Sequence, residues 1–245
     1  MIGNTLRSLQ VAFAVLECVA ENQPVGVSLI SRELELPKTT VQRSLEALAR
    51  EGWILRSDNR DWILSSKVLG LAAHMDVQKH LSRVAKPAMK KLTEAVQETV
   101  HLTVLEGSVV VLIEKSSPAR ALRTWSRIGG TQPAYTASTG KAMLAPLSDE
   151  EIRQIVGTEL AALTPRTVTS FDNFMKKIKE TRRKGYAIND REGNPDITAI
   201  AAAIVDRLGR PVAAISISAP SSRVPRSKWA EYGALVIGAA NSVVV

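Results

Sequence analysis

The side chains best suited to chemistry in this chain gather between residues 36 and 52. Their polar positions recur at helical spacing, and their types bond the phosphates and base edges of DNA. Arginine pairs with guanine, and glutamine with adenine, through two parallel hydrogen bonds. The candidate DNA-binding side chains are Lys38, Thr39, Thr40, Gln42 and Arg43. Because a plain amphipathic surface helix carries similar residues, the neighbouring segments decide between the two interpretations.

The same stretch predicts a helix that would hold these side chains on one face. Pro37 suits the first helical turn, where its missing N–H costs nothing, and Gly52 suits the position just past a helix end. Val41, Leu45 and Leu48 repeat at i, i+4 and i+7 and form an apolar face. The polar candidates therefore lie opposite a face that packs into a core.

Two further predicted helices precede this one. Apolar residues between positions 6 and 20 recur with a helical period, and residues 28–34 predict a short second helix with Ser28 as its N-cap. Only residues 35 and 36 separate that second helix from the amphipathic one. Two short helices joined by a tight turn form a helix-turn-helix, which favours the DNA-binding interpretation.

A predicted β-hairpin follows the three helices. Its strands are residues 53–56 and 61–64, on either side of residues that favour a turn. Three helices followed by a hairpin are the order of a winged helix. Arg56 and Arg60 would lie on or near the wing, within reach of phosphates.

Beyond the hairpin, residues 67–97 read as two linker helices whose apolar stripe we interpret as a dimer contact. From residue 100 the period becomes strand-like, with helical segments between the strands. The predicted strands are residues 101–105, 109–114, 121–127, 185–188, 197–206 and 211–219, with a long loop over 132–138. The predicted helices begin near Thr139 and span residues 150–156, 171–184 and 229–244. Strands with helices on one side predict an α+β domain with an antiparallel sheet.

Charge and cysteine content limit the partners and the compartment. The net charge of +8 favours a polyanionic partner, although residues 1–86 hold eleven Lys and Arg against nine Asp and Glu. The chain has a single cysteine, Cys18, in an apolar helical pattern. One cysteine alone excludes a disulfide framework and a cysteine-rich metal site. No segment has the length of a membrane span, and the N-terminus lacks a signal-peptide pattern. We therefore expect a cytoplasmic protein with no membrane partner.

Enzymatic interpretations find little support in the residues. Thr139-Gly140-Lys141 resembles part of a phosphate loop, but that motif needs glycine and Ser or Thr where this chain has Tyr135 and Ala142. No Gly-x-Ser-x-Gly elbow occurs, and residues 190–192 suit a polar loop. The histidines suit packing or surface roles; they are His74, His80 and His101. We expect no catalytic residue, no metal site and no cofactor.

Four segments, taken in order, carry a resemblance to a known family. They are residues 36–48, Pro133 with residues 136–145, Gly185-Tyr186-Ala187, and residues 213–220. Together they resemble the IclR family of bacterial transcriptional regulators over nearly the whole chain. The resemblance implies a winged helix-turn-helix over residues 1–66, linker helices over 67–98 and a GAF-like α/β effector domain over 99–245. It also implies homodimers, often paired into tetramers.

The resemblance further implies a cleft for a small-molecule effector in the C-terminal domain. Carried over onto this chain, its residues are Leu122, Trp125, Ser138, Thr139, Asn189, Ile197, Ala199, Ser216 and Ser218. The chain departs from the family where Asn189 replaces a usual acidic residue, Asp196 a common glycine, Ala199 a common cysteine and Tyr135 a frequent histidine. An uncharged Asn189 and the helix start near Thr139 favour an anion, and Trp125 suits a ring. We therefore expect a small carboxylate or an aromatic acid.

These observations favour one function and leave a second open. The first is a ligand-responsive, sequence-specific transcriptional regulator that binds a double-stranded DNA operator and a small-molecule effector, expected to control a catabolic operon. The second is a small-molecule-binding or enzymatic domain whose winged helix serves protein interaction. Retention of specific DNA in a mobility shift distinguishes them.

Overall fold

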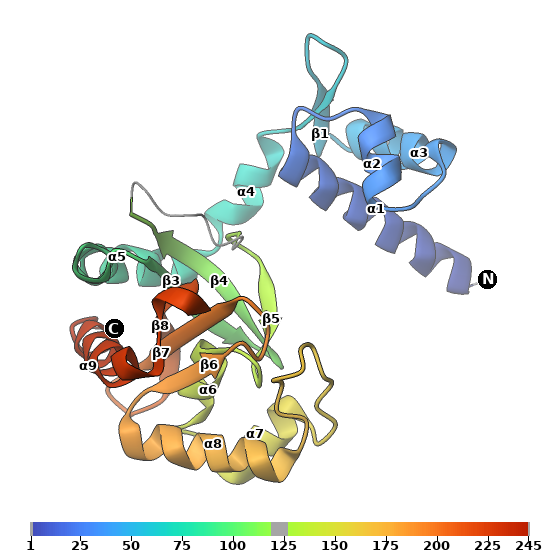
Figure 1. The fold of residues 1–245 in the computed structure, drawn as a ribbon. Coiled ribbons are helices and arrows are strands. Elements are labelled where there is room, and N and C mark those ends of the chain that lie inside the picture. The colour runs from blue at the N-terminus through green and yellow to red at the C-terminus, as the bar shows by residue number, and fades with distance from the viewer. Residues whose placement is uncertain (1, 119–126, 245) are drawn as a thin grey trace. The chain divides into compact units, whose positions relative to one another are not determined.

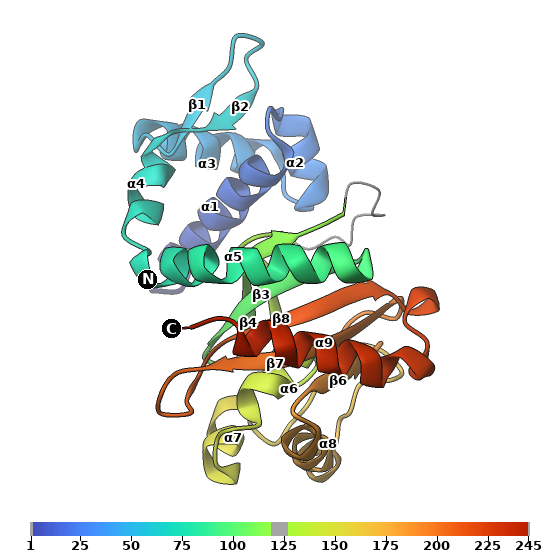
Figure 2. The same cartoon turned by 90° about the vertical axis from the view of Figure 1, so that its left-hand side faces the viewer.

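The computed structural model describes residues 2–118 and 127–244. The chain divides into two compact units, residues 1–76 and residues 77–245, which are described one at a time. Figure 1 and Figure 2 show their helices and strands. Within the described residues, every helix is too short or too polar to cross a lipid bilayer.

The first unit is helical with a small hairpin, in the order that the sequence predicts (Figure 1). Its elements are α1 (Ile2–Asn22), α2 (Val27–Glu33), α3 (Lys38–Arg50), β1 (Ile54–Arg56), β2 (Trp62–Leu64) and α4 (Lys67–Ala73). β1 and β2 pair antiparallel, with Ile54 opposite Leu64. The predicted winged helix-turn-helix is confirmed.

The apolar core of this unit fixes the orientation of α3. Val41, Leu45 and Leu48 are buried, as their spacing predicts. They cluster with Val15 of α1 and Trp62 of β2. Burying a large aliphatic side chain contributes about 1.5–3 kcal/mol, so these residues hold α3 in one rotation about its axis. The polar face of α3 must then point away from the core.

Two helix ends in this unit differ from the prediction. Gly26, and not Ser28, is the N-cap of α2, and no side chain caps that helix. Pro37 is the N-cap of α3 and does not belong to its first turn. Gly52 follows α3 with a φ of 76°, as its predicted place past the helix end requires.

The second unit is built on a six-stranded antiparallel sheet with strand order β5-β4-β3-β8-β7-β6. Its elements are α5 (Asp76–Val96), β3 (Thr99–Glu106), β4 (Val109–Ser116), β5 (Thr131–Pro133), α6 (Ser138–Leu144), α7 (Asp149–Val156), α8 (Phe171–Lys184), β6 (Ala187–Asp190), β7 (Ile197–Val205), β8 (Pro211–Pro220) and α9 (Trp229–Asn241). The antiparallel sheet is as predicted. The helices, however, cover both faces of it and not one (Figure 2).

α5 and α9 pack on one face of the sheet. Leu81, Ala85, Met89 and Leu92 of α5 are buried there with apolar residues of the strands. The α5 part of the stripe interpreted as a dimer contact is therefore covered by the chain's own sheet, whereas Leu69 and Leu71 of α4 are exposed. α6, α7 and α8 form a second apolar cluster with the opposite face.

Smaller differences concern the lengths of predicted elements. Residues 131–133, which include part of the expected loop, form β5 on the edge of the sheet beside β4. α9 ends at Asn241, three residues before the predicted end. The predicted strand over residues 121–127 lies almost wholly outside the described residues.

Candidate DNA interface and ligand pocket

The polar face of α3 is exposed at three of its five predicted DNA-binding positions. Lys38, Thr39 and Arg43 are exposed, whereas Thr40 and Gln42 are partly buried. The Gln42 amide nitrogen also donates a hydrogen bond of 2.7 Å to a carboxylate oxygen of Glu46, one turn further along. That carboxylate holds Gln42 against the helix surface beside Arg43.

The wing is shaped by an arginine that stacks on a tryptophan. The Arg56 guanidinium lies 3.9 Å from the centroid of the Trp62 ring and also donates a hydrogen bond to the carbonyl of Arg60. Arg60 itself is exposed, with a left-handed backbone φ of 63° at the turn. Arg56 therefore fixes the hairpin tip. The side chain of Arg60, by contrast, makes no hydrogen bond, ion pair or ring contact with the other described residues. Both predicted wing residues lie on the hairpin or its tip.

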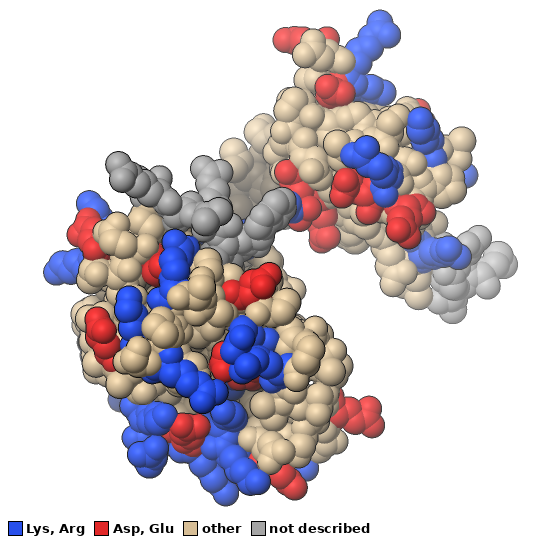
Figure 3. Space-filling view, in the orientation of Figure 1, with Lys and Arg blue, Asp and Glu red and all other residues tan. Residues whose placement is uncertain are grey.

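Charge on the first unit is mixed in sign, as Figure 3 shows for the visible face. Residues 1–76 contain eight Lys and Arg and nine Asp and Glu. A DNA contact by this unit would therefore depend on where its cations lie and not on a net positive field.

In the second unit, the pairing register of the strands creates a pocket. Directly paired residues of neighbouring strands place their side chains on the same face of a sheet. His101 of β3 pairs with Ser216 of β8, and Ser218 of β8 pairs with Ala199 of β7. Ala199 in turn pairs with Asn189 of β6. A row of mostly polar side chains thus crosses the face opposite α5 and α9.

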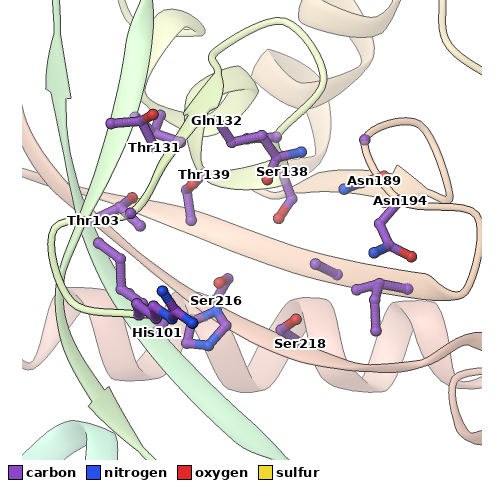
Figure 4. Close-up of a pocket in the computed structure, with 18 residues that line it drawn as sticks. His101, Thr103, Thr131, Gln132, Ser138, Thr139, Asn189, Asn194, Ser216 and Ser218 are labelled. Atoms are coloured by element: carbon purple, nitrogen blue, oxygen red, sulfur yellow. The ribbon is translucent and has the colours of Figure 1, made fainter. Parts of the chain in front are cut away.

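This row forms the floor of a cavity of about 330 Å³ (Figure 4). Ser138 and Thr139, at the start of α6, line the other side together with Gln132 of β5. Seven of the nine predicted effector residues meet at this cavity: Ser138, Thr139, Asn189, Ile197, Ala199, Ser216 and Ser218. The other two, Leu122 and Trp125, lie outside the described residues.

The charged lining of the cavity has one sign. Arg127 lines it, and no carboxylate does among the described residues. Two carboxamides add hydrogen-bond donors. The backbone N–H of Glu192 donates to the Asn189 side-chain oxygen at 2.8 Å, and that of Asp196 donates to the Asn194 side-chain oxygen at 2.9 Å. These bonds orient each carboxamide through its oxygen, and its NH₂ group can donate to a ligand. The site can therefore hydrogen-bond an anion, and Arg127 contributes a positive charge to its lining.

His101 is a cavity residue that sequence reasoning missed. It was interpreted as a packing or surface histidine, but it lines the cavity with only 8% of its surface exposed. Burial, with the charge of Lys115 on the neighbouring strand, lowers the pKa of His101 to about 4, so the imidazole is neutral at pH 7. The spacing of His101 and Thr103, two positions apart on one strand, predicts that their side chains share a face of the sheet. Which of the two faces lines the cavity depends on how the strands pair, and the sequence alone does not show that.

The Thr-Gly-Lys segment serves packing and not phosphate binding. A Cβ on Gly140 would lie 2.1 Å from the Ala134 carbonyl oxygen, so only glycine fits there. Lys141 is buried, and its ammonium bonds a Glu192 carboxylate oxygen at 2.6 Å. Burial lowers the pKa of Lys141, and the charge of Glu192 partly offsets this. The pair ties α6 to the loop after β6, and both segments contribute to the cavity.

The part of the chain that the structure describes contains no cluster of three or more His, Cys, Asp or Glu side chains that could hold a metal ion. The arrangement is therefore a binding cavity in one unit and an exposed helix with a wing in the other. This combination is that of a bacterial transcriptional regulator with a ligand pocket.

Comparison with family models identifies the family. The model described as "Bacterial transcriptional regulator IclR C-terminal" matches residues 73–245, and "IclR helix-turn-helix domain" matches residues 8–58. The chain belongs to the IclR family of bacterial transcriptional regulators, as the sequence resemblance predicted.

Individual relatives agree over nearly the full length. The HTH-type transcriptional regulator KdgR of Escherichia coli K12 is 29% identical over 242 residues, covering 98% of this chain and 92% of that protein. The HTH-type transcriptional repressor AllR of the same strain is 31% identical, covering 89% and 81%. An IclR homolog from Microbacterium hydrocarbonoxydans, solved in complex with 4-hydroxybenzoate, has a TM-score of 0.75 at 25% identity, covering 96% and 97%. This chain is accordingly a transcriptional regulator and not an enzyme.

Proposed function

We propose that this regulator binds an operator through its winged helix and responds to a small carboxylic acid, aliphatic or aromatic, bound in the cavity. The observation that carries the effector class is the lining, which among the described residues offers Arg127 and amide donors but no carboxylate. An anion is the ligand that such a set of groups stabilises. The repressor relatives support control of a catabolic operon.

The operator contacts in this proposal come from α3 and the wing. They are Lys38, Thr39, Thr40, Gln42, Arg43, Arg56 and Arg60. Arg43→Ala is expected to weaken specific binding by about 1–3 kcal/mol and to relax base preference at one position, as loss of a guanine contact does. Arg32→Ala on α2 is the matched control, since it removes an exposed arginine of the same unit outside that set. Unchanged operator affinity of the Arg43 variant in a mobility shift would remove it from the interface.

The effector site is tested by closing the cavity. Ser138 is 3% exposed and lines it, so Ser138→Leu fills the space that a ligand needs. We expect this variant to bind DNA normally and to lose the response to ligand. Ser222→Leu, on an exposed turn outside the cavity, is the control. A response retained at the same ligand concentration would mean that the pocket is misplaced, and loss of DNA binding would make Ser138 a structural residue.

We also propose that the protein acts as a homodimer, and that dimers pair into tetramers. One winged helix contacts too little DNA for strong specificity, and two-fold dimers reading paired half-sites are the usual solution. Large apolar side chains of the first unit are 50% exposed or more on α1 and α4: Leu6, Leu9, Phe13, Leu69 and Leu71. A second copy of the chain would cover such a surface.

A further inference from the structure

Two buried polar atoms beside the cavity have no hydrogen-bond partner within the described residues. They are Nε2 of His101 and Oγ1 of Thr103, and both residues line the cavity. The two residues are two positions apart on β3, so they share the sheet face that forms its floor (Figure 4). Leaving a buried polar group unpaired destabilises a fold, so such groups call for a specific explanation.

We propose that the ligand is a carboxylic acid bearing hydroxyl groups, and that His101 and Thr103 bind one of those hydroxyls. The inference rests on the ligand-responsive function proposed above and narrows the class of its effector. It also assigns two binding residues that the family resemblance did not supply.

The chemistry of the two side chains favours a hydroxyl over other ligand groups. A neutral imidazole has one N–H donor and one acceptor nitrogen, and the Thr103 hydroxyl both donates and accepts. A ligand hydroxyl also does both, so it can satisfy either atom. A hydroxyl does so for either tautomer of the imidazole, whereas a carboxylate, which offers acceptors alone, satisfies Nε2 only when that nitrogen carries the proton. A methylene or an unsubstituted ring edge offers neither a donor nor an acceptor.

Other polar residues that line the cavity could bond further hydroxyl groups of the ligand. The strands that carry His101 and Asn189 are three positions apart in the sheet, about 14 Å between backbones. Polar groups therefore lie at both ends of the cavity, with the hydroxyls of Ser216 and Ser218 between them (Figure 4). A site built to bond a ligand hydroxyl discriminates strongly against the analogue that lacks it, because its own polar groups are then left unpaired.

The test compares each hydroxylated acid with its counterpart lacking the hydroxyls. The probes are lactate and propionate, gluconate and hexanoate, and 4-hydroxybenzoate and benzoate, titrated into the full chain by calorimetry. We expect at least one hydroxylated acid to bind about tenfold more tightly than its counterpart, as one good hydrogen bond would provide.

Two variants assign that preference to residues. Thr103→Val and His101→Phe keep the approximate shape of each side chain and remove its hydrogen-bonding atoms. Each should reduce the preference to about threefold or less. Thr103→Val should also leave the melting temperature of the free protein unchanged or raise it, because its hydroxyl has no hydrogen-bond partner to lose among residues 2–118 and 127–244. If His101→Phe fails to fold, Thr103→Val alone carries the assignment.

Thr181→Val is the matched control. Thr181 is a buried threonine outside this cavity whose hydroxyl donates to the Lys177 carbonyl at 2.9 Å. Its variant should lower the melting temperature and keep the ligand preference.

Three results would overturn the inference. If the acids without hydroxyls bind as tightly, the hydroxylated class is wrong while the proposed carboxylate effector stands. If the preference survives both β3 variants, His101 and Thr103 do not bind the hydroxyl. If no probe of either kind binds at millimolar concentration, the proposed carboxylate effector is wrong as well. Binding of operator DNA in a mobility shift then still tests the proposed DNA-binding function separately.

Discussion

Breaking the buried Lys141–Glu192 ion pair should lower the free energy of unfolding far more than breaking an exposed ion pair does. The side chains are 1% and 7% exposed, and the Lys141 ammonium lies 2.6 Å from the Glu192 carboxylate. Both charged groups are buried, and burial is the largest cause of the lowered Lys141 pKa, so removing either partner would leave the other charge unpaired where charge is costly. Removing one partner of such a pair costs about 3–5 kcal/mol.

The assay is urea unfolding of the full chain, followed by circular dichroism. We expect Lys141→Met to lower the free energy of unfolding by about 3–5 kcal/mol, and a Lys141→Met/Glu192→Leu double variant to recover most of the loss. Lys184→Met is the matched control. Lys184 bonds Glu180 at the same 2.6 Å, but the two side chains are 28% and 43% exposed, so we expect a loss below about 1 kcal/mol.

Two outcomes would refute this reasoning. One is a loss for Lys141→Met no larger than that for Lys184→Met, which would mean that burial does not govern the pair. The other is a double variant that is less stable than Lys141→Met alone, which would mean that the two residues do not act together.

The remaining predictions concern pH, salt and assembly. Because burial lowers the pKa of His101 from 6.5 to about 4, the unfolded chain binds a proton in that range that the folded chain does not. The free energy of unfolding should therefore fall by about 3 kcal/mol as pH drops from 7 to 4, and His101→Phe should remove that part of the slope in urea titrations. Arg60→Ala should weaken binding to all DNA sequences alike and lower the salt slope by about one unit, and a changed base preference at constant slope would contradict a phosphate contact. Sedimentation at micromolar concentration should give at least a dimer, and a monomer would exclude the proposed two-fold reading of DNA.

The winged helix could be predicted from the sequence because its signals are local. The spacing of Val41, Leu45 and Leu48 lies within one helix, and the hairpin follows after a short turn. The errors at Ser28 and Pro37 are errors of capping. A capping position depends on backbone angles and hydrogen bonds that residue type alone does not determine.

The pocket could be predicted only through the family resemblance, because its floor depends on pairing between distant segments. His101 meets Ser216 across β3 and β8, more than a hundred residues apart in the chain. Nothing in the local pattern indicates which face His101 takes. The sequence argues against a phosphate loop at Thr139-Gly140-Lys141 but gives no reason for Gly140; that reason is the close approach of the Ala134 backbone.

Ligand-controlled binding of specific DNA is the central claim, and selection from a random duplex pool tests it most directly. The full chain should enrich one sequence motif, with two-fold related halves if the proposed dimer reads it. An acid from the probe series should change the affinity for that motif in the wild type and leave it unchanged in Ser138→Leu. A pool that shows no enrichment after repeated selection, or a motif whose affinity responds equally in both proteins, would contradict the account.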